Sequence, residues 1–221
     1  SDLVSTDRPD GESGIRFEMA DGPGGMFGSS DATTDAGLMQ DEWEKMKPAI
    51  QQASGLMLCV DGSDESAHAV QAAFAALPGR VGSLGPLPKI TRVAIALTKA
   101  DSRFAVHRKE AYARAVKADP FKRLEQIARA SVLAIARAVP KDALIGAFWT
   151  SAYGFDRKEG FANYDPGNDR LLTFANYEPV SVIDSWVPFQ VMAPFLFLAG
   201  CPEAPGRAVR TAGALRSQML R

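Results

Sequence analysis

The feature of this sequence that most constrains its fold is an uninterrupted apolar run, Val93-Ala94-Ile95-Ala96-Leu97, which gives way abruptly to polar residues. A strand that is apolar at every position is typical of a parallel sheet covered by helices on both faces. We therefore expect a buried strand over Ile90–Ala96. Because ligands of open α/β sheets bind at the carboxyl ends of the strands, a site is expected in the polar residues that follow.

The polar residues that follow are Thr98-Lys99-Ala100-Asp101. They resemble Asn-Lys-x-Asp, the base-recognition motif of the Ras-like P-loop GTPases, with Thr in place of Asn. The resemblance implies that Asp101 accepts two hydrogen bonds from guanine, since charge-assisted bidentate bonds are strong. It also implies that the methylenes of Lys99 lie along the base plane and that Thr98 holds the loop. A solvated turn is the alternative interpretation of these four residues.

A second motif, Asp21-Gly22-Pro23-Gly24, follows Ile15–Ala20, an alternating segment that we expect to complete an N-terminal hairpin. It resembles the Asp-x-x-Gly motif of the same family. The resemblance implies that Asp21 contacts Mg²⁺ through a water molecule and that the backbone N–H of Gly24 donates to the terminal phosphate. A Pro-Gly loop after a strand is the alternative.

A third motif, Ser151-Ala152, follows the apolar segment Ala143–Trp149, which we expect to be another buried strand. It resembles the Ser-Ala loop of the family, in which a backbone N–H donates to the guanine carbonyl and so rejects adenine. We therefore expect Thr150–Gly154 to be a loop beside the base.

Strands and helices alternate along the rest of the chain, which is the pattern of a doubly wound sheet. Gly55–Asp61 is expected to be a strand and Gly79–Lys89 a loop. The expected helices are one that begins at Asp41 and kinks at Pro48, and those at Ser63–Leu77, Arg103–Ala118, Phe121–Val139, Trp186–Leu198 and Ala204–Arg221. The basic side chains of Arg103–Ala118 are expected to form a solvated face.

The composition is that of an ordinary soluble protein, with 46% hydrophobic and 23% charged residues. A length of 221 residues fits a single domain over 1–221, with an irregular insertion at about 156–180 and a helical segment at about 184–221. A net charge of −1 gives no reason to expect a nucleic acid or an anionic membrane as partner.

Three further observations bear on location. Cys59 and Cys201 lack metal-ligand spacing, so we expect a reducing, cytoplasmic setting. No signal peptide is recognised at the N-terminus. Trp186–Gly200, the most apolar stretch, is too short and too interrupted by Pro to span a membrane.

The three motifs occur in the family's order, each after an expected strand. The resemblance predicts an α/β fold: a doubly wound, mostly parallel sheet flanked by helices, with an N-terminal hairpin strand. It implies a guanine-nucleotide-binding domain that acts as a molecular switch, with GTP or GDP and Mg²⁺ as ligands and a protein effector or partner domain.

The sequence also departs from the family. The phosphate-binding loop, Gly-x-x-x-x-Gly-Lys-Ser/Thr, does not occur in the 221 residues, and Gly25 stands where many members place a water-orienting Gln. Since that loop supplies a Lys and a Mg²⁺-ligating hydroxyl, we expect this chain not to hydrolyse GTP at a useful rate.

Three interpretations stay open. The sequence is a GTPase domain whose N-terminal piece is not included, a non-catalytic pseudo-GTPase interaction module, or an unrelated α/β protein with chance motifs. The family's sheet has a strand between those that correspond to Ile15–Ala20 and Leu56–Asp61. If its place is kept, the two segments lie two strand spacings of about 4.8 Å apart, measured between Phe17 and Leu58.

Overall fold

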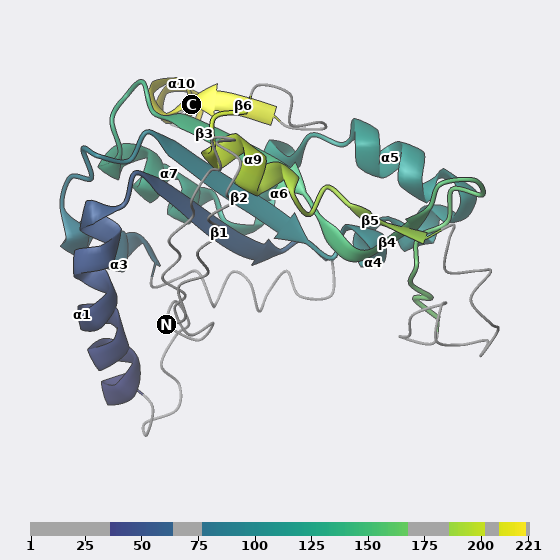
Figure 1. The fold of residues 1–221 in the computed structure, drawn as a ribbon, viewed down its shortest axis with the longest axis horizontal. Helices are drawn as coiled ribbons and strands as arrows, with labels where there is room; N and C mark the ends of the chain where they lie inside the picture. The colour runs from purple at the N-terminus through teal and green to yellow at the C-terminus, as the bar shows by residue number, and fades with distance from the viewer. Residues whose placement is uncertain (1–35, 64–76, 168–185, 202–207, 220–221) are drawn as a thin grey trace, which may run out of the picture.

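The apolar run forms the second strand of a four-stranded sheet in the computed structural model, which describes residues 36–63, 77–167, 186–201 and 208–219. In spatial order the strands are β1 (Gly55–Asp61), β2 (Arg92–Thr98), β3 (Leu144–Trp149) and β6 (Ala208–Thr211). The β1–β2 and β2–β3 pairs are parallel, and β6 joins β3 antiparallel (Figure 1). The expected mixed α/β class with a mostly parallel sheet is confirmed.

The three parallel strands end together at one edge of the sheet. Asp61 lies opposite Thr98 in the β1–β2 register, and Leu97 lies opposite Trp149 in the β2–β3 register. The predicted strands at Gly55–Asp61, Ile90–Ala96 and Ala143–Trp149 are therefore confirmed, with the central one placed two residues further along the chain.

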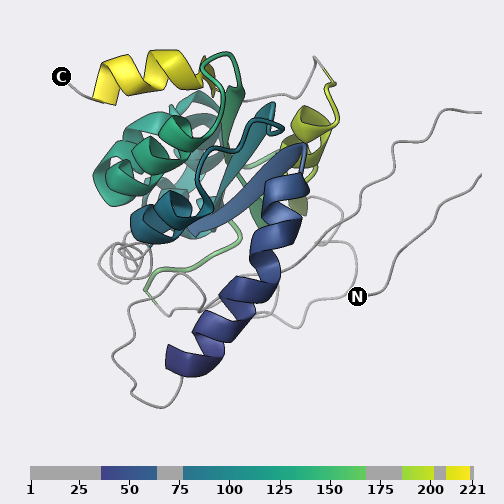
Figure 2. The same ribbon diagram turned by 90° about the vertical axis from the view of Figure 1, so that its left-hand side faces the viewer.

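Helices cover both faces of the sheet. The described helices are α1 (Ala36–Gln52), α3 (Leu77–Leu84), α4 (Ala100–Phe104), η2 (Ala105–Glu110), α5 (Ala111–Lys117), α6 (Pro120–Ile127), α7 (Arg129–Ala138), α9 (Ala193–Leu198) and α10 (Ala212–Met219). Figure 2 shows α9 on one side of the strands and the group that includes α7 and α10 on the other. This layering places the polar strand ends at the rim, outside both cores.

The alternation of side chains along β2 explains why its sequence is apolar throughout. Val93, Ile95 and Leu97 pack into the large core with α6 and α7, whereas Ala94 packs against Phe197 of α9. Ala94 is small because α9 crosses directly over this face of the strand. Each of the four is at most 2% exposed, so both faces of β2 are buried over this stretch and none of these four positions tolerates a charge.

Two predicted elements near the N-terminal side of the sheet differ from those observed. The helix expected to begin at Asp41 begins at Ala36 and continues past Pro48 to Gln52. The loop expected over Gly79–Lys89 is helical as far as Leu84, as part of α3. Leu77, Val81 and Leu84 of α3 are buried at helical spacing, so packing of one face outweighs the low helix propensity of two glycines.

Two predicted long helices are each divided. The helix expected over Phe121–Val139 is broken into α6 and α7 at Ala128, where φ is −144°. The helix expected over Arg103–Ala118 is divided into α4, η2 and α5, with φ 50° and ψ −122° at Arg108. Neither Ala nor Arg has a preference for ending a helix, so tertiary packing determines where these two helices are interrupted.

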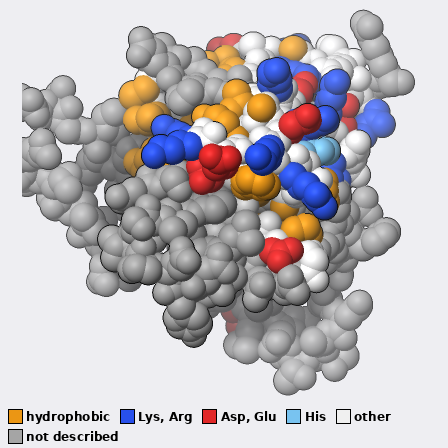
Figure 3. Space-filling model, turned by 90° about the vertical axis from the view of Figure 1, so that its right-hand side faces the viewer, with side chains coloured by type: hydrophobic (Ala, Val, Ile, Leu, Met, Phe, Trp, Pro, Cys, Tyr) orange, Lys and Arg blue, Asp and Glu red, His pale blue; other side chains and the backbone are white. Residues whose placement is uncertain are grey.

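The basic part of this segment lies on the surface, as expected. Arg108, Lys109, Arg114 and Lys117 are exposed, and Figure 3 shows Lys and Arg side chains gathered on this face. Arg114 forms an ion pair with Glu110 at 2.8 Å. Burial lowers the pKa of His107, and the charges of Arg114 and Arg103 lower it further, although Glu110 opposes them.

The predictions for the C-terminal part were wrong in three places. The segment expected to be a helix over Trp186–Leu198 begins as a strand, β5 (Trp186–Phe189), and becomes helical only at Ala193. The segment expected to be a helix over Ala204–Arg221 contains β6 before α10. The loop expected over Thr150–Gly154 instead opens β4 (Ser151–Asp156), which pairs antiparallel with β5.

Several expectations fall outside the described residues. They are the N-terminal hairpin, the Asp21–Gly24 motif, most of the Ser63–Leu77 helix, much of the 156–180 insertion and the separation of Phe17 from Leu58.

Candidate functional site

The carboxyl edge of the sheet is held together by backbone hydrogen bonds between its loops. The N–H of Gly62 donates to the carbonyl of Thr98 at 3.0 Å, and the N–H of Ala100 donates to the carbonyl of Thr150 at 3.0 Å. The N–H of Thr150 donates to the carbonyl of Leu97 at 2.8 Å. The residues that follow β1, β2 and β3 therefore form one connected region, which is the candidate site.

Asp101 and Ser151, predicted from two separate motifs, meet in this region. Asp101 lies in the first turn of α4 and is 3% exposed. The hydroxyl of Ser151 donates to Oδ1 of Asp101 at 2.6 Å and accepts the N–H of Gly154 at 2.8 Å. The hydroxyl is thus fixed at both ends, and it fixes the carboxylate in turn.

Gly154 explains why β4 can supply this N–H. Its φ is +69°, and a Cβ at this position would lie 1.8 Å from the carbonyl oxygen of Val187 in β5. A residue with a side chain would force β4 and β5 apart. The glycine therefore permits β4 and β5 to pair closely. In this arrangement the hydroxyl of Ser151 lies between the N–H of Gly154 and the carboxylate of Asp101.

The surroundings of Asp101 have opposing effects on its pKa. Burial raises the pKa of Asp101, while the hydrogen bond from Ser151, backbone N–H groups and the charge of Lys99 lower it in part. Hydrogen-bond donors favour the ionised carboxylate and desolvation disfavours it. In this conformation the carboxylate is covered, so a base reaches it only if the covering groups move.

Lys99 and Asp101 point to different parts of the site because of the backbone between β2 and α4. Lys99 is in the left-handed region, with φ 58° and ψ 39°, which is uncommon for a residue with a side chain. Its ammonium lies 2.7 Å from Oδ2 of Asp61 at the end of β1, and its side chain is 62% exposed. The turn thus buries Asp101 and leaves Lys99 at the surface.

The other predicted base-side residues have simpler surroundings. The hydroxyl of Thr98 donates to the carbonyl of Val60 at 3.3 Å, so it connects the ends of β1 and β2. Ala152 is exposed on β4, next to Ser151. Asp21 and Gly24, predicted for the phosphate and Mg²⁺ side, lie outside the described residues.

The structure adds residues that the sequence did not single out for a role. Oδ1 of Asp61 accepts the N–H and the hydroxyl of Ser63 at 2.9 and 2.7 Å. Arg123 of α6, which is 8% exposed, donates from Nε to the carbonyl of Gly62 at 3.2 Å and from its guanidinium to the carbonyl of Ser63. Burial lowers the pKa of Arg123, and Asp61 opposes that shift.

The sequence carried a signal for one of these residues only. Asp61 is a polar residue at the end of an apolar strand, as Asp101 is just after one. Arg123 lies about sixty residues away on an amphipathic helix, and nothing in its local pattern distinguishes it from a solvated arginine.

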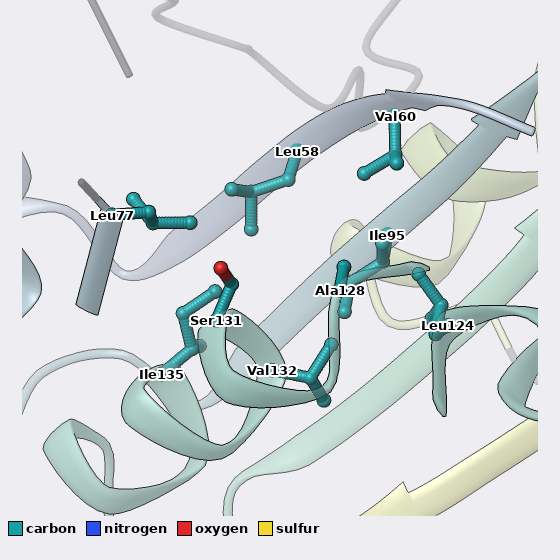
Figure 4. Close-up of a pocket in the computed structure, with 9 residues that line it drawn as sticks. All are labelled: Leu58, Val60, Leu77, Ile95, Leu124, Ala128, Ser131, Val132 and Ile135. Atoms are coloured by element: carbon teal, nitrogen blue, oxygen red, sulfur yellow. The ribbon is translucent and has the colours of Figure 1, made fainter. Parts of the chain in front are cut away.

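A small apolar pocket lies away from this edge. It has a volume of about 10 Å³ between β1, β2 and the α6–α7 layer, and Figure 4 shows mainly aliphatic side chains around it, including Leu58, Ile95 and Val132. A space of this size holds at most about one water molecule. Among the described residues, this pocket is therefore too small to hold a nucleotide.

Within the described ranges, no three or more His, Cys, Asp and Glu side chains cluster in a way that could hold a metal ion. In the same part of the chain, no helix has both the length and the apolar character needed to cross a membrane.

Comparisons with protein-family models, with curated proteins and with solved structures found no match to this chain.

Proposed function

We propose that this chain is a guanine-nucleotide-binding domain of the Ras-like class and that Asp101 is its base-reading carboxylate. The observation that carries the proposal is the hydrogen bond between Ser151 and Asp101, two residues 50 positions apart that two separate motifs of the same family assign to the same base. Asp101 follows β2, and Ser151 follows the adjacent parallel strand β3. This is the edge at which ligands of such sheets bind.

The chemistry of the carboxylate fits a base with two neighbouring N–H donors. Guanine offers its ring N–H and its exocyclic amine side by side, and an ionised carboxylate accepts both. Ser151 fixes the orientation of Asp101, so little freedom is lost when the base binds. The bonds formed are strong because water is scarce around a carboxylate that is 3% exposed.

The burial of Asp101 also lowers the apparent affinity for a base. The base binds only to conformations in which Asp101 is uncovered, and the apparent affinity falls in proportion to the fraction of such conformations. Within the proposal, the methylenes of Lys99 lie along the base, and Thr98 keeps the ends of β1 and β2 in register.

The phosphate half of the proposal rests on the sequence. Asp21 is proposed to hold Mg²⁺ through a water molecule, and the backbone N–H of Gly24 is proposed to donate to the terminal phosphate of GTP. The domain is then a cytoplasmic molecular switch that reports its nucleotide to a protein effector or partner domain.

The burial of Asp101 also favours a second candidate, a non-catalytic interaction module with the same fold. In that case the Ser151–Asp101 hydrogen bond joins α4 to β4 as part of the scaffold, and the carboxylate never meets a nucleotide. The lack of a phosphate-binding loop in these 221 residues agrees with this candidate.

Titration with fluorescent GDP and ADP analogues in the presence of Mg²⁺ tests the proposal. The unmutated chain is expected to prefer GDP to ADP, and Asp101→Asn is expected to prefer XDP, because the amide donates to the xanthine carbonyl. Asp142→Asn, an exposed residue before the amino end of β3, is the matched control and keeps the GDP preference. Equal binding of GDP and ADP, or no binding of either, contradicts the proposal and favours the interaction module.

A further inference from the structure

The side chain of Lys99 is held in one direction by a contact outside its own turn. It is 62% exposed, and a lysine at such a position ordinarily samples many rotamers. Here its ammonium lies 2.7 Å from Oδ2 of Asp61, on the neighbouring strand. Asp61 is opposite Thr98 in the β1–β2 register, so the lysine reaches from the end of β2 across the end of β1.

Asp61 is itself held from two sides, which makes it a fixed acceptor. The N–H and hydroxyl of Ser63 occupy its Oδ1, and this directs Oδ2 toward Lys99. The turn that contains Ser63 is fixed by the buried guanidinium of Arg123. Gly62 completes the turn, because a Cβ at this position would lie 2.5 Å from the ring of Trp149.

Lys99 and Asp101, which flank Ala100, are therefore held by residues on opposite sides of β2. Asp101 is held by Ser151 on the β3 side, and Lys99 is held by Asp61 on the β1 side. The stem of Lys99 therefore runs from the end of β2 toward the end of β1.

We propose that Asp61 is a positioning residue for nucleotide binding, which sets the stem of Lys99 against the face of the base by holding its ammonium at the end of β1. This inference rests on the proposed function. Lys99 then contributes contact with the flat face of a purine, and Asp101 reads the edge. The contribution of Asp61 is consequently independent of which groups the purine carries on that edge.

A double-mutant cycle with Asp61→Asn, Lys99→Met and the double variant tests this role, with GDP and IDP as ligands. IDP lacks the exocyclic amine that Asp101 would read. Asp61→Asn is expected to weaken both ligands by the same factor, about fivefold for a partly exposed ion pair. In the Lys99→Met background the same substitution is expected to have no effect. Asp142→Asn is again the matched control.

A second measurement reports on the lysine without any nucleotide. Acetylation of Lys99 by a soluble reagent, followed by mass spectrometry, is expected to be several-fold faster in Asp61→Asn than in the unmutated chain. Asp61→Glu is expected to restore slow acetylation, because it keeps the charge within reach.

The outcomes separate the two proposals. If the unmutated chain does not prefer GDP to ADP, the proposed function fails and the nucleotide role of Asp61 fails with it, whatever the acetylation rates. If GDP is preferred but Asp61→Asn weakens binding equally in both backgrounds, Asp61 acts on the structure and not through Lys99, and the inference alone is overturned. Unchanged affinity in Asp61→Asn overturns it as well.

Discussion

Replacing Ser151 by Ala tests the hydrogen-bond chain at the centre of the candidate site. The substitution removes a donor that lies 2.6 Å from Oδ1 of Asp101 and an acceptor that lies 2.8 Å from the N–H of Gly154. A hydrogen bond to a charged group contributes about 1.5–3 kcal/mol, and an unsatisfied buried N–H costs about 1–3 kcal/mol. Because Asp101 and Ser151 are each 3% exposed, little water replaces the lost partners. We expect the free energy of unfolding at pH 8 to fall by about 2–4 kcal/mol.

The pH dependence follows from the direction of the pKa shift. Burial raises the pKa of Asp101 above its unfolded value, and the bond from Ser151 opposes this, so Ser151→Ala raises the pKa of Asp101 further. Between the unfolded and folded pKa values the native state binds more protons than the unfolded state, so stability falls as pH rises through that window. The penalty of Ser151→Ala is therefore larger at pH 8 than near pH 5, where protonation of Asp101 is more extensive.

Urea unfolding followed by circular dichroism at the two pH values measures both effects. Ser83→Ala removes an exposed hydroxyl that donates to the carbonyl of Arg80 and is the control, with an expected change below about 0.5 kcal/mol at either pH. A Ser151→Ala penalty that is below about 1 kcal/mol at pH 8, or that is larger at pH 5 than at pH 8, refutes the reasoning that an ionised, buried Asp101 depends on this donor.

Three further predictions concern the supports of the site and the basic face. Gly154→Ala is expected to lower the unfolding free energy by more than about 2 kcal/mol, since its Cβ would overlap the Val187 carbonyl and its φ is +69°; a loss near zero in urea unfolding would show that β4 and β5 separate without cost. Arg123→Met is expected to cost about 2–4 kcal/mol, because two backbone carbonyls after β1 lose their donor, and an unchanged melting temperature would contradict it. Arg114→Gln is expected to raise the pKa of His107, whose protonation the Arg114 charge opposes; NMR titration that shows no change or a lowered pKa excludes that coupling.

The sheet could be predicted from the sequence because its signal is local. The buried strands are continuous apolar runs, and Val93, Ala94 and Ile95 leave no room for a solvent-facing position. Their parallel arrangement follows from the helices between them. The antiparallel strand β6 carried no such signal, since Ala208–Thr211 is short, is nowhere fully buried and ends in two consecutive polar residues.

The helix boundaries were harder because distant residues decide them. Ala128 and Arg108 have no preference for breaking a helix, yet both do so here. The strand β4 is similar: Ser151–Asp156 becomes a strand because β5, which follows some thirty residues later, pairs with it. No window of sequence around Tyr153 contains that information.

The candidate site likewise has a part that the sequence predicts and a part that depends on contacts between distant residues. The sequence indicated the base-side residues because they belong to two short motifs, each of which follows a recognisable strand. These residues are Thr98, Lys99, Asp101, Ser151 and Ala152. The sequence could not indicate that Asp101 is covered or that Asp61 holds Lys99, since both depend on contacts across neighbouring strands. The roles assigned to these residues stay predictions until a nucleotide is tested.

Asp101→Asn distinguishes the two proposed functions through stability as well as binding. The amide keeps the shape of the carboxylate, and its oxygen still accepts the hydroxyl of Ser151, but the buried charge that opposes folding is gone. We expect its unfolding free energy at pH 8 to equal or exceed that of the unmutated chain, while the preference for GDP is lost. A carboxylate kept where an amide is at least as stable is typical of a residue retained for function. If Asp101→Asn instead loses as much stability as Ser151→Ala, the carboxylate is a structural acceptor, and the non-catalytic interaction module becomes the better account of this edge.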